Sequence, residues 1–252
     1  MINQIKAFAD NIINIPLMKR KTKKEHQLAV VTINYNKAES VESLIQSLNK
    51  SKYKDFMLYI VDNNSNKACI EQLQDMLYKF KDIDISFIIN SKNEGWGMAI
   101  NQAVDWIHEP LLIVLNNDTR VKENTIGELV NYMNQHPEVG ICGTRILNAD
   151  GSLASAGGKA DWLTKLTGIT RENKARHNTI APVILNDNEY VDDCAWCIKT
   201  EIMSPTLNKN PKQIIRYPNY LFLYFEELYI IRGARQNGWK VAYNPLAEVF
   251  HY

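Results

Sequence analysis

Four short polar segments, each within a few residues of the end of an apolar run, carry the side chains best suited to binding a charged ligand. They are Asn34-Tyr35-Asn36, Asp62-Asn63-Asn64-Ser65, Asn93-Glu94-Gly95-Trp96-Gly97 and Asn116-Asn117-Asp118-Thr119. Each one alone is typical of a turn or a helix cap, because Asn, Asp, Ser and Gly favour such positions for local reasons. Together on one rim, they would line a crevice with hydrogen-bond donors, acceptors and carboxylates.

Such a crevice suits the binding of a diphosphate through a metal ion. The sequence contains neither the Gly-x-Gly-x-x-Gly pattern of dinucleotide-binding folds nor the Gly-Lys-Ser/Thr of a P-loop. A diphosphate bound without those devices needs another counter-charge, which Mg²⁺ or Mn²⁺ held by carboxylate oxygen supplies. Asp118 is the best placed ligand because it follows a buried-strand pattern. Asp62 is a candidate to accept hydrogen bonds from a base or ribose.

The alternation of apolar runs and amphipathic segments predicts the elements that position these side chains. Apolar, β-branched runs predict strands at residues 28–33, 56–61, 83–89 and 111–115. Apolar residues at helical spacing predict helices at residues 41–48, 70–77, 97–107 and 126–133. This alternation predicts an α/β fold with a mostly parallel central sheet flanked by helices. Ligands of such sheets bind beyond the carboxyl ends of the strands, where the four polar segments fall.

Composition is that of an ordinary globular protein. The 252 residues suffice for one large domain, which we assign to residues 27–252. The net charge of +1 argues against a dedicated nucleic-acid binder. No stretch approaches the ~20 apolar residues of a membrane span and no signal peptide is visible, so we expect a soluble or peripheral protein. Cys194 and Cys197 form a lone Cys-x-x-Cys, which we interpret as buried thiols in a reducing, cytoplasmic setting.

Residues 1–26 form a separate basic and amphipathic N-terminal segment. Apolar residues recur there at helical spacing until Pro16 stops the pattern: Ile5, Phe8, Ile12 and Ile13. Basic residues follow within six positions: Lys19, Arg20, Lys21, Lys23 and Lys24. An apolar helical face beside a basic run can lie on an anionic membrane surface. The alternatives are a frayed lead-in, or a helix packed on the domain with its lysines in solvent.

The motifs resemble those of family 2 glycosyltransferases, specifically the rhamnosyltransferase-like branch, in order and spacing over residues 27–252. Beyond the four polar segments, the resemblance rests on His136-Pro137-Glu138-Val139-Gly140, Asp150-Gly151-Ser152-Leu153, Tyr224-Phe225-Glu226-Glu227, Gly238-Trp239-Lys240-Val241 and Val249-Phe250-His251. Any one motif alone would be a weak signal. The full set implies a GT-A fold, and an inverting transfer of a sugar from a nucleotide-diphosphate donor.

The resemblance also implies roles for individual residues. The family's Asp-x-Asp metal motif corresponds to residues 116–118, so only Asp118 keeps a carboxylate, and His251 matches a histidine that can help to hold the metal. The catalytic base corresponds to Glu227, which follows Glu226 where the family has Glu-Asp. Trp196 matches a segment beside the acceptor site, where it either stacks on a sugar face or belongs to the core. The implied donor-binding residues are Asn34, Tyr35, Asn36, Asp62, Asn64, Asn93, Gly95, Trp96, Gly97, Asn116, Asn117 and Asp118.

Departures from the family pattern keep other functions open. Tyr229 stands where the family often has a second acidic residue, and Gly233 where it has an arginine, with Arg232 one place early. These changes favour a catalytically impaired, glycan-binding module with the same fold. A sugar nucleotidyltransferase is a weaker alternative, because its glycine-rich loop after the first strand is replaced by Asn-Tyr-Asn-Lys. Residues 154–190 are either a flap over the donor or a solvated loop.

The implied partners are a UDP- or dTDP-sugar, a divalent cation (Mn²⁺ or Mg²⁺), and a glycan or lipid-linked oligosaccharide acceptor. The implied setting is bacterial cell-surface polysaccharide synthesis, in the cytoplasm or peripherally at the inner face of the plasma membrane. No nucleic acid is expected. A homodimer is compatible with this reading.

Overall fold

Runs of buried apolar residues form four parallel strands at the centre of the protein. The structure is a computed structural model that describes residues 12–14, 25–159, 176, 178–208, 210–220 and 226–252. The four strands are β2 (Leu28–Asn34), β3 (Phe56–Asp62), β4 (Asp84–Asn90) and β5 (Leu111–Leu115). They lie in the order β4-β3-β2-β5, with Asn34 beside Asp62 at the carboxyl rim. The predicted parallel sheet is confirmed here, with each strand within a residue of its expected bounds.

The second half of the sheet mixes directions. Strand β12 (Ala195–Lys199) runs antiparallel between β5 and β7 (Val139–Leu147). Strand β13 (Lys240–His251) lies parallel to β7 and carries β10 (Val183–Ile184) on its outer edge. Short strands complete the set: β6 (Thr119–Val121) on β13, β8 (Leu153–Ser155) on β7, and β9 (Gly158–Lys159) paired with β11 (Glu189–Tyr190). The start of β12 and the end of β13 therefore reach the carboxyl rim of β5.

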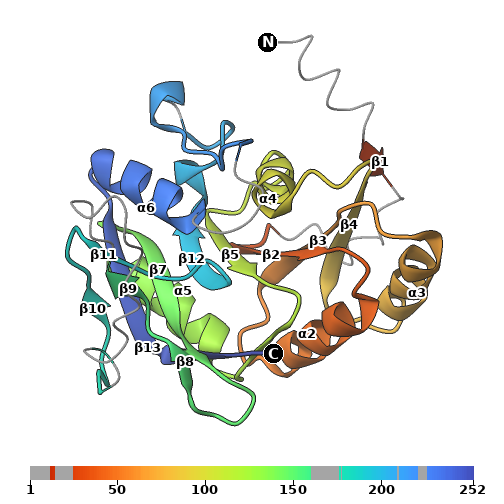
Figure 1. Ribbon diagram of the computed structural model, residues 1–252, viewed down its shortest axis with the longest axis horizontal. Coiled ribbons are helices and arrows are strands. Elements are labelled where there is room, and N and C mark those ends of the chain that lie inside the picture. The colour runs from red at the N-terminus through yellow and green to blue at the C-terminus, as the bar shows by residue number, and fades with distance from the viewer. Residues whose placement is uncertain (1–11, 15–24, 160–175, 177, 209, 221–225) are drawn as a thin grey trace.

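Helices cover both faces of the sheet (Figure 1). On one face lie α2 (Ala38–Lys50), α3 (Lys67–Leu77) and α5 (Thr125–Gln135). On the other lie α4 (Trp96–Val104) and α6 (Glu226–Gln236). Short 3₁₀ helices occur at η2 (Thr200–Ile202) and η3 (Pro211–Gln213). Helix α4 ends at Val104, before the predicted limit at residue 107. Residues 105–107 form turns whose N–H groups donate to carbonyls three positions earlier.

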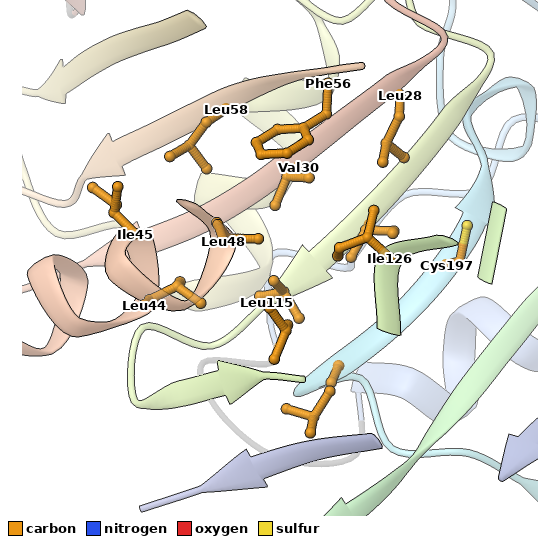
Figure 2. Packing of buried hydrophobic residues seen from close by; sticks show 14 of the residues in the cluster. Leu28, Val30, Leu44, Ile45, Leu48, Phe56, Leu58, Leu115, Ile126 and Cys197 are labelled. Atoms are coloured by element: carbon orange, nitrogen blue, oxygen red, sulfur yellow. The ribbon is translucent and has the colours of Figure 1, made fainter. Parts of the chain in front are cut away.

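The hydrophobic core consists of two layers, one on each face of the sheet. In the layer under α2, Leu44, Ile45 and Leu48 belong to the same buried cluster as Val30 and Leu58 of the strands (Figure 2). These residues are fully buried. Burial of a whole apolar side chain stabilises a fold by about 1.5–3 kcal/mol, so this packing holds the strand ends at fixed positions.

The predicted N-terminal helix is wrong at residues 12–14, which form strand β1 (Ile12–Asn14) antiparallel to β4. The parallel half of the sheet ends at β4, whose outer edge would expose unpaired backbone groups if β1 did not pair with it. β-branched isoleucines suit such a strand. Residues 1–11 and 15–24 lie outside the described residues, so membrane contact by residues 1–26 stays a prediction. Within the described part of the chain, no helix is long and apolar enough to cross a bilayer.

The four cysteines are free, buried thiols, as predicted. Burial raises the pKa of the Cys142 and Cys194 thiols well above the ordinary value. Such thiols stay protonated at neutral pH and are poor nucleophiles and metal ligands. The Cys-x-x-Cys pattern at Cys194 and Cys197 therefore belongs to the core.

Candidate active site

The loops after β2 and β3 are joined by a buried hydrogen-bond network. The side-chain amide of Asn34 donates to Asp62 Oδ2 (2.7 Å) and to Ser65 Oγ (3.1 Å). Ser65 donates to Asp62 from both its backbone N–H (2.7 Å) and its hydroxyl (2.7 Å). Asn34 and Asp62 are fully buried. Asp62 therefore holds the two rim loops together from their buried side. Direct contact of Asp62 with a base or ribose stays a prediction.

Two asparagines give these loops their shape. Asn36 (φ 55°) and Asn64 (φ 67°) adopt the left-handed region, which Asn tolerates better than most residues. Asn36 Oδ1 accepts hydrogen bonds from the backbone (2.8 Å) and side chain (2.9 Å) of Asn66. Tyr35, between these anchors, is 49% exposed. Tyr35, Asn36 and Asn64 thus face solvent on this rim, and their role in donor binding stays a prediction.

The third loop is fastened to the second. The side-chain amide of Asn63 donates to Asn93 Oδ1 (2.7 Å) and to the carbonyl of Gly95 (3.2 Å). Gly95 (φ 86°) makes the turn into α4 that an L side chain would strain. A Cβ at Gly97 would lie 2.8 Å from Tyr217 Cβ, and Trp96 packs edge-on against the same tyrosine (centroids 5.4 Å apart). The predicted segment 93–97 is thus held between Asn63 and Tyr217, neither of which was predicted as a site residue.

Asp118 and His251 come together from distant parts of the chain. Asp118 follows β5, and His251 ends β13 opposite Thr119. The backbone N–H of Tyr252 donates to the Asp118 carbonyl (3.1 Å), and His251 Nε2 lies 3.1 Å from Asp118 Oδ1. Burial alone would raise the pKa of Asp118, but its contact with His251 and the charge of that ring outweigh burial and lower it. The same contact raises the pKa of His251, against the opposing effect of partial burial.

The geometry of this pair fits a divalent cation. Two ligand atoms bound at ~2.1 Å to one cation, at a right angle, lie ~3.0 Å apart, and the observed separation is 3.1 Å. Oδ1 of Asp118 is buried and contacts His251 Nε2. Carboxylate and imidazole are suitable ligands for Mn²⁺. Asn116 and Asn117 precede this pair on the same rim and are partly exposed.

A cluster of carboxylates lies on the same side of the molecule. Asp193, Glu226 and Glu227 each offer an oxygen within 4.8 Å of the others. Burial, followed by the charges of Glu227, Glu226 and Asp192, raises the pKa of Asp193 well above the ordinary value. The charges of Asp118 and Glu227 both help to raise the pKa of the Cys194 thiol, after burial and the charges of Asp192 and Asp193, so both carboxylates lie near Cys194. The candidate metal ligand and the candidate base therefore face one region.

Asp193 was missed as a site residue, although the sequence carries a signal for it. Asp192-Asp193 directly precedes the apolar run of β12. Because β12 is antiparallel to β5, its start lies at the rim where β5 ends, and Asn116 N–H donates to the Cys194 carbonyl (2.8 Å). An acidic pair that precedes an antiparallel strand can thus lie at the same rim as residues that follow the parallel strands. The direction of β12 was not predictable from its own residues.

The prediction that Trp196 stacks on an acceptor sugar is wrong, and the core alternative holds. Trp196 is fully buried in β12, between β5 and β7. It belongs to the core layer that packs under α4 and α6. Successive side chains of a strand point to opposite faces of the sheet, and the Trp196 side chain lies on the face that α4 and α6 cover.

The predicted flap over residues 154–190 falls partly outside the described residues, which omit 160–175 and 177. The described ends of this stretch are held together by β9 and β11 and by an ion pair between Arg176 and Glu189 (2.8 Å). The choice between a flap and a solvated loop stays a prediction.

The sheet, its helices and the polar rim define a GT-A glycosyltransferase fold. A solved structure of GalNAc-T7 with UDP, GalNAc and Mn²⁺ matches 89% of this chain and 43% of its own, with a TM-score of 0.67 and 18% identity. The chain belongs to glycosyl transferase family 2, whose family model matches residues 29–192, more than half of the sequence. The predicted family and fold are confirmed, and the rhamnosyltransferase-like branch stays a prediction.

Two curated relatives of this chain are a glycosyltransferase and a polymerase. An uncharacterized glycosyltransferase of Methanocaldococcus jannaschii is 30% identical over 114 residues, covering 44% of this chain and 39% of the relative. A teichoic acid poly(glycerol phosphate) polymerase of Staphylococcus epidermidis is 24% identical over 223 residues, covering 81% of this chain and 29% of the relative. The chain thus spans less than half the length of these relatives.

Proposed function

We propose that this chain transfers a sugar from a nucleotide-diphosphate donor to a glycan or lipid-linked acceptor, with inversion at the anomeric carbon. The observation that carries the proposal is the arrangement around Cys194. The charges of Asp118, the partner of His251, and of Glu227 both act on the thiol of this residue, which supports a common location near the start of β12. Diphosphate binding needs positive charge near Asp118, and acceptor activation needs a base near Glu227. Both requirements meet at one rim.

Asp118 and His251 would hold Mn²⁺ or Mg²⁺, with the diphosphate and water as the other ligands. When bound, the cation neutralises the charge that develops on the leaving diphosphate. The Asn34–Asn36 and Asp62–Asn64 loops would receive the nucleotide. The segment from Asn93 to Gly97 would approach the donor sugar. The rigid networks beneath these loops support such roles, because a preorganised site needs little rearrangement to bind.

Glu227 would act as the general base, with Glu226 beside it. As the acceptor oxygen forms its bond to the anomeric carbon, its proton passes to a carboxylate oxygen of Glu227. The bond from the anomeric carbon to the phosphate oxygen breaks, and its electron pair leaves with the nucleoside diphosphate. A single displacement from the opposite face inverts the anomeric configuration. Positioned general bases contribute about 10²–10⁴-fold to rate.

One relative supports a proposal for the cellular setting and, through it, for the acceptor. The teichoic acid polymerase relative supports a role in cell-surface glycan synthesis. We propose a cytoplasmic reaction, at the inner face of the plasma membrane where lipid-linked acceptors lie. A UDP- or dTDP-sugar is the proposed donor, and a rhamnosyl donor is the hypothesis that the motifs favour.

A donor screen tests this function. Thermal unfolding is measured with Mn²⁺ and UDP-, dTDP- or GDP-sugars, because a ligand that binds only the folded state raises the unfolding temperature. Donors that stabilise the protein are then assayed for release of the nucleoside diphosphate with and without glycan acceptors. We expect stabilisation that depends on Mn²⁺, followed by turnover. Absence of any donor that binds would contradict the proposal.

A second candidate, a glycan-binding module without catalysis, is favoured by the packing at Gly233. A Cβ there would lie 2.7 Å from Ile215 Cδ1, so the position of the family arginine is occupied by the Ile215 segment. Tyr229, at the position of the second acidic residue, is 46% exposed. Donor binding without turnover, with any acceptor, would support this candidate.

A further inference from the structure

Asp193 is held in place beside the proposed base. Its backbone neighbour Cys194 accepts the hydrogen bond from Asn116, and β12 begins at the next residue. Its carboxylate lies within 4.8 Å of those of Glu226 and Glu227. Oδ2 of Asp193 is buried and has no hydrogen-bond partner among the described residues. A buried carboxylate oxygen in this state is costly if it is charged.

The groups that act on Asp193 offer it no positive charge within the described part of the chain. Glu226 and Glu227 approach from α6, Asp192 from its own segment, and each charge raises the pKa of Asp193. Tyr217 approaches from the segment that packs on Gly97. Burial, and then the charges of Asp193, Glu227 and Glu226, raise the pKa of the Tyr217 phenol, so it stays neutral.

Carboxylates this close do not all ionise readily, so the three groups together retain a proton near neutral pH. We assign this proton to Asp193, because its Oδ2 is buried without a hydrogen-bond partner among the described residues and lies in the cluster with Glu226 and Glu227. Burial and then the charges of those neighbours raise the pKa of Asp193. The proton gives Asp193 an O–H donor that faces two carboxylates.

We propose that Asp193 is a neutral carboxylic acid in the working enzyme and is a positioning residue, whose O–H group donates to Glu227 and fixes the direction of that base. This inference rests on the proposed function of Glu227. Asp193 keeps its proton throughout the transfer, while the proton of the acceptor passes to Glu227. When Asp193 ionises at high pH, the donor is lost and a further negative charge lies beside the base, so turnover falls.

The protonation state can be measured without any turnover. Wild-type protein carrying ¹³C in the aspartate side-chain carboxyl groups is titrated by NMR, and the Asp193 signal is the one absent in Asp193→Asn. We expect this signal to titrate above neutral pH, and its midpoint to fall in Glu227→Gln, which removes a neighbouring charge. The exposed Asp187, identified by Asp187→Asn, is followed in the same spectra as the comparison signal.

Kinetics test the positioning role. We expect Asp193→Asn, which keeps a neutral N–H donor, to lower turnover at pH 7 less than about tenfold. Asp193→Ala is expected to lower it about 100-fold, since misplacing a base by ~1 Å costs about that much. The fall in turnover at high pH is expected in the wild type and absent in Asp193→Asn.

Three results would overturn the proposal. The first is an Asp193 signal that titrates near the ordinary aspartate pKa of about 3.9. The second is an Asp193 signal that becomes ionised at neutral pH when Mg²⁺ is added, because the cluster would then be a cation site. The third is an unchanged fall at high pH in Asp193→Asn. If the wild type turns over no donor, the proposed function fails, while the NMR titration still decides whether Asp193 is neutral.

Discussion

Oδ1 of Asp118 lies 3.1 Å from Nε2 of His251, and this contact joins the loop after β5 to the last residues of β13. Pairing of β13 with both β7 and β6 carries His251 to the rim. Asp118 and His251 come from distant segments of the chain, and the pairing of the strands brings both potential ligands beside one cation position. The proposed metal site is therefore a product of the sheet and not of one local motif.

Loss of either ligand should weaken cation binding. We expect Asp118→Asn and His251→Ala each to lower Mn²⁺ affinity at least about tenfold, because even changes in the groups that orient a ligand typically cost 10–100-fold. Calorimetric titration of Mn²⁺ in the presence of UDP measures the effect. Asp150→Asn, which removes a carboxylate from the protein surface, is the control and should bind normally. Equal affinity in all variants would refute the assignment.

Ser65 should matter for both folding and nucleotide binding. Its hydroxyl donates to Asp62 (2.7 Å) and accepts from the Asn36 backbone (2.7 Å). Ser65→Ala leaves these buried groups short of a partner, so we expect a loss of about 1–3 kcal/mol in the free energy of unfolding. Urea denaturation measures this loss, and nucleotide titration should show weaker binding. Ser43→Ala, which removes one hydrogen bond within α2, is the control. Wild-type stability in Ser65→Ala would mean that water replaces the hydroxyl.

Two glycines in helices should respond to alanine in opposite directions. A Cβ at Gly97 lies 2.8 Å from Tyr217 Cβ, whereas one at Gly127 in α5 meets nothing closer than 4.0 Å. We expect Gly97→Ala to destabilise the protein by about 1–3 kcal/mol through overpacking. Gly127→Ala should stabilise it by about 0.5–1 kcal/mol, as in a helix interior. Thermal unfolding of both variants decides, and a stable Gly97→Ala with normal donor binding would contradict the close packing of Tyr217 on α4.

The sequence predicts the parallel half of the sheet well because its signals are local. Val30 and Leu58 lie in continuous apolar runs, and a strand buried on both faces needs such a run. Asn36 and Asn64 sit where the chain turns, and Asn is a residue that tolerates the left-handed conformation. The position of these rim residues at the ends of the strands could therefore be predicted without a structure.

The remaining features depend on contacts between distant segments. Ile12 joins a strand because β4 offers an open edge, although its spacing suits a helix. Trp196 is a core residue because β12 lies between two strands. Asp193 reaches the rim because β12 is antiparallel. None of these outcomes can be predicted from the residues of the segment alone, because each depends on the strand with which the segment pairs.

The ion pair between Arg176 and Glu189 predicts a pH dependence of stability. Partial burial would raise the pKa of Glu189, but hydrogen bonds from Asn186 N–H (2.8 Å) and Arg176 outweigh it and lower the pKa. A lowered folded pKa stabilises the protein above the unfolded value of about 4.3, and this stabilisation is lost as pH falls through the folded pKa. We expect Glu189→Gln to cost about 1–3 kcal/mol at pH 7, and progressively less below pH ~4.

Urea denaturation of wild type and Glu189→Gln between pH 7 and the lowest pH at which both fold measures this difference. Asp187→Asn, a nearby exposed carboxylate, is the matched control. A difference that stays constant across the range would show that Glu189 acts through packing and not through its charge.

The most direct test of the account is donor turnover in Glu227→Gln. The amide keeps the shape of the side chain and cannot accept the acceptor proton, so we expect turnover to fall by about 10²–10⁴-fold, with unchanged Mn²⁺-dependent nucleotide affinity. Glu138→Gln, at an exposed carboxylate next to His136, should retain wild-type turnover. Turnover in Glu227→Gln equal to that of the wild type would contradict the account, because Glu227 would then not be the base.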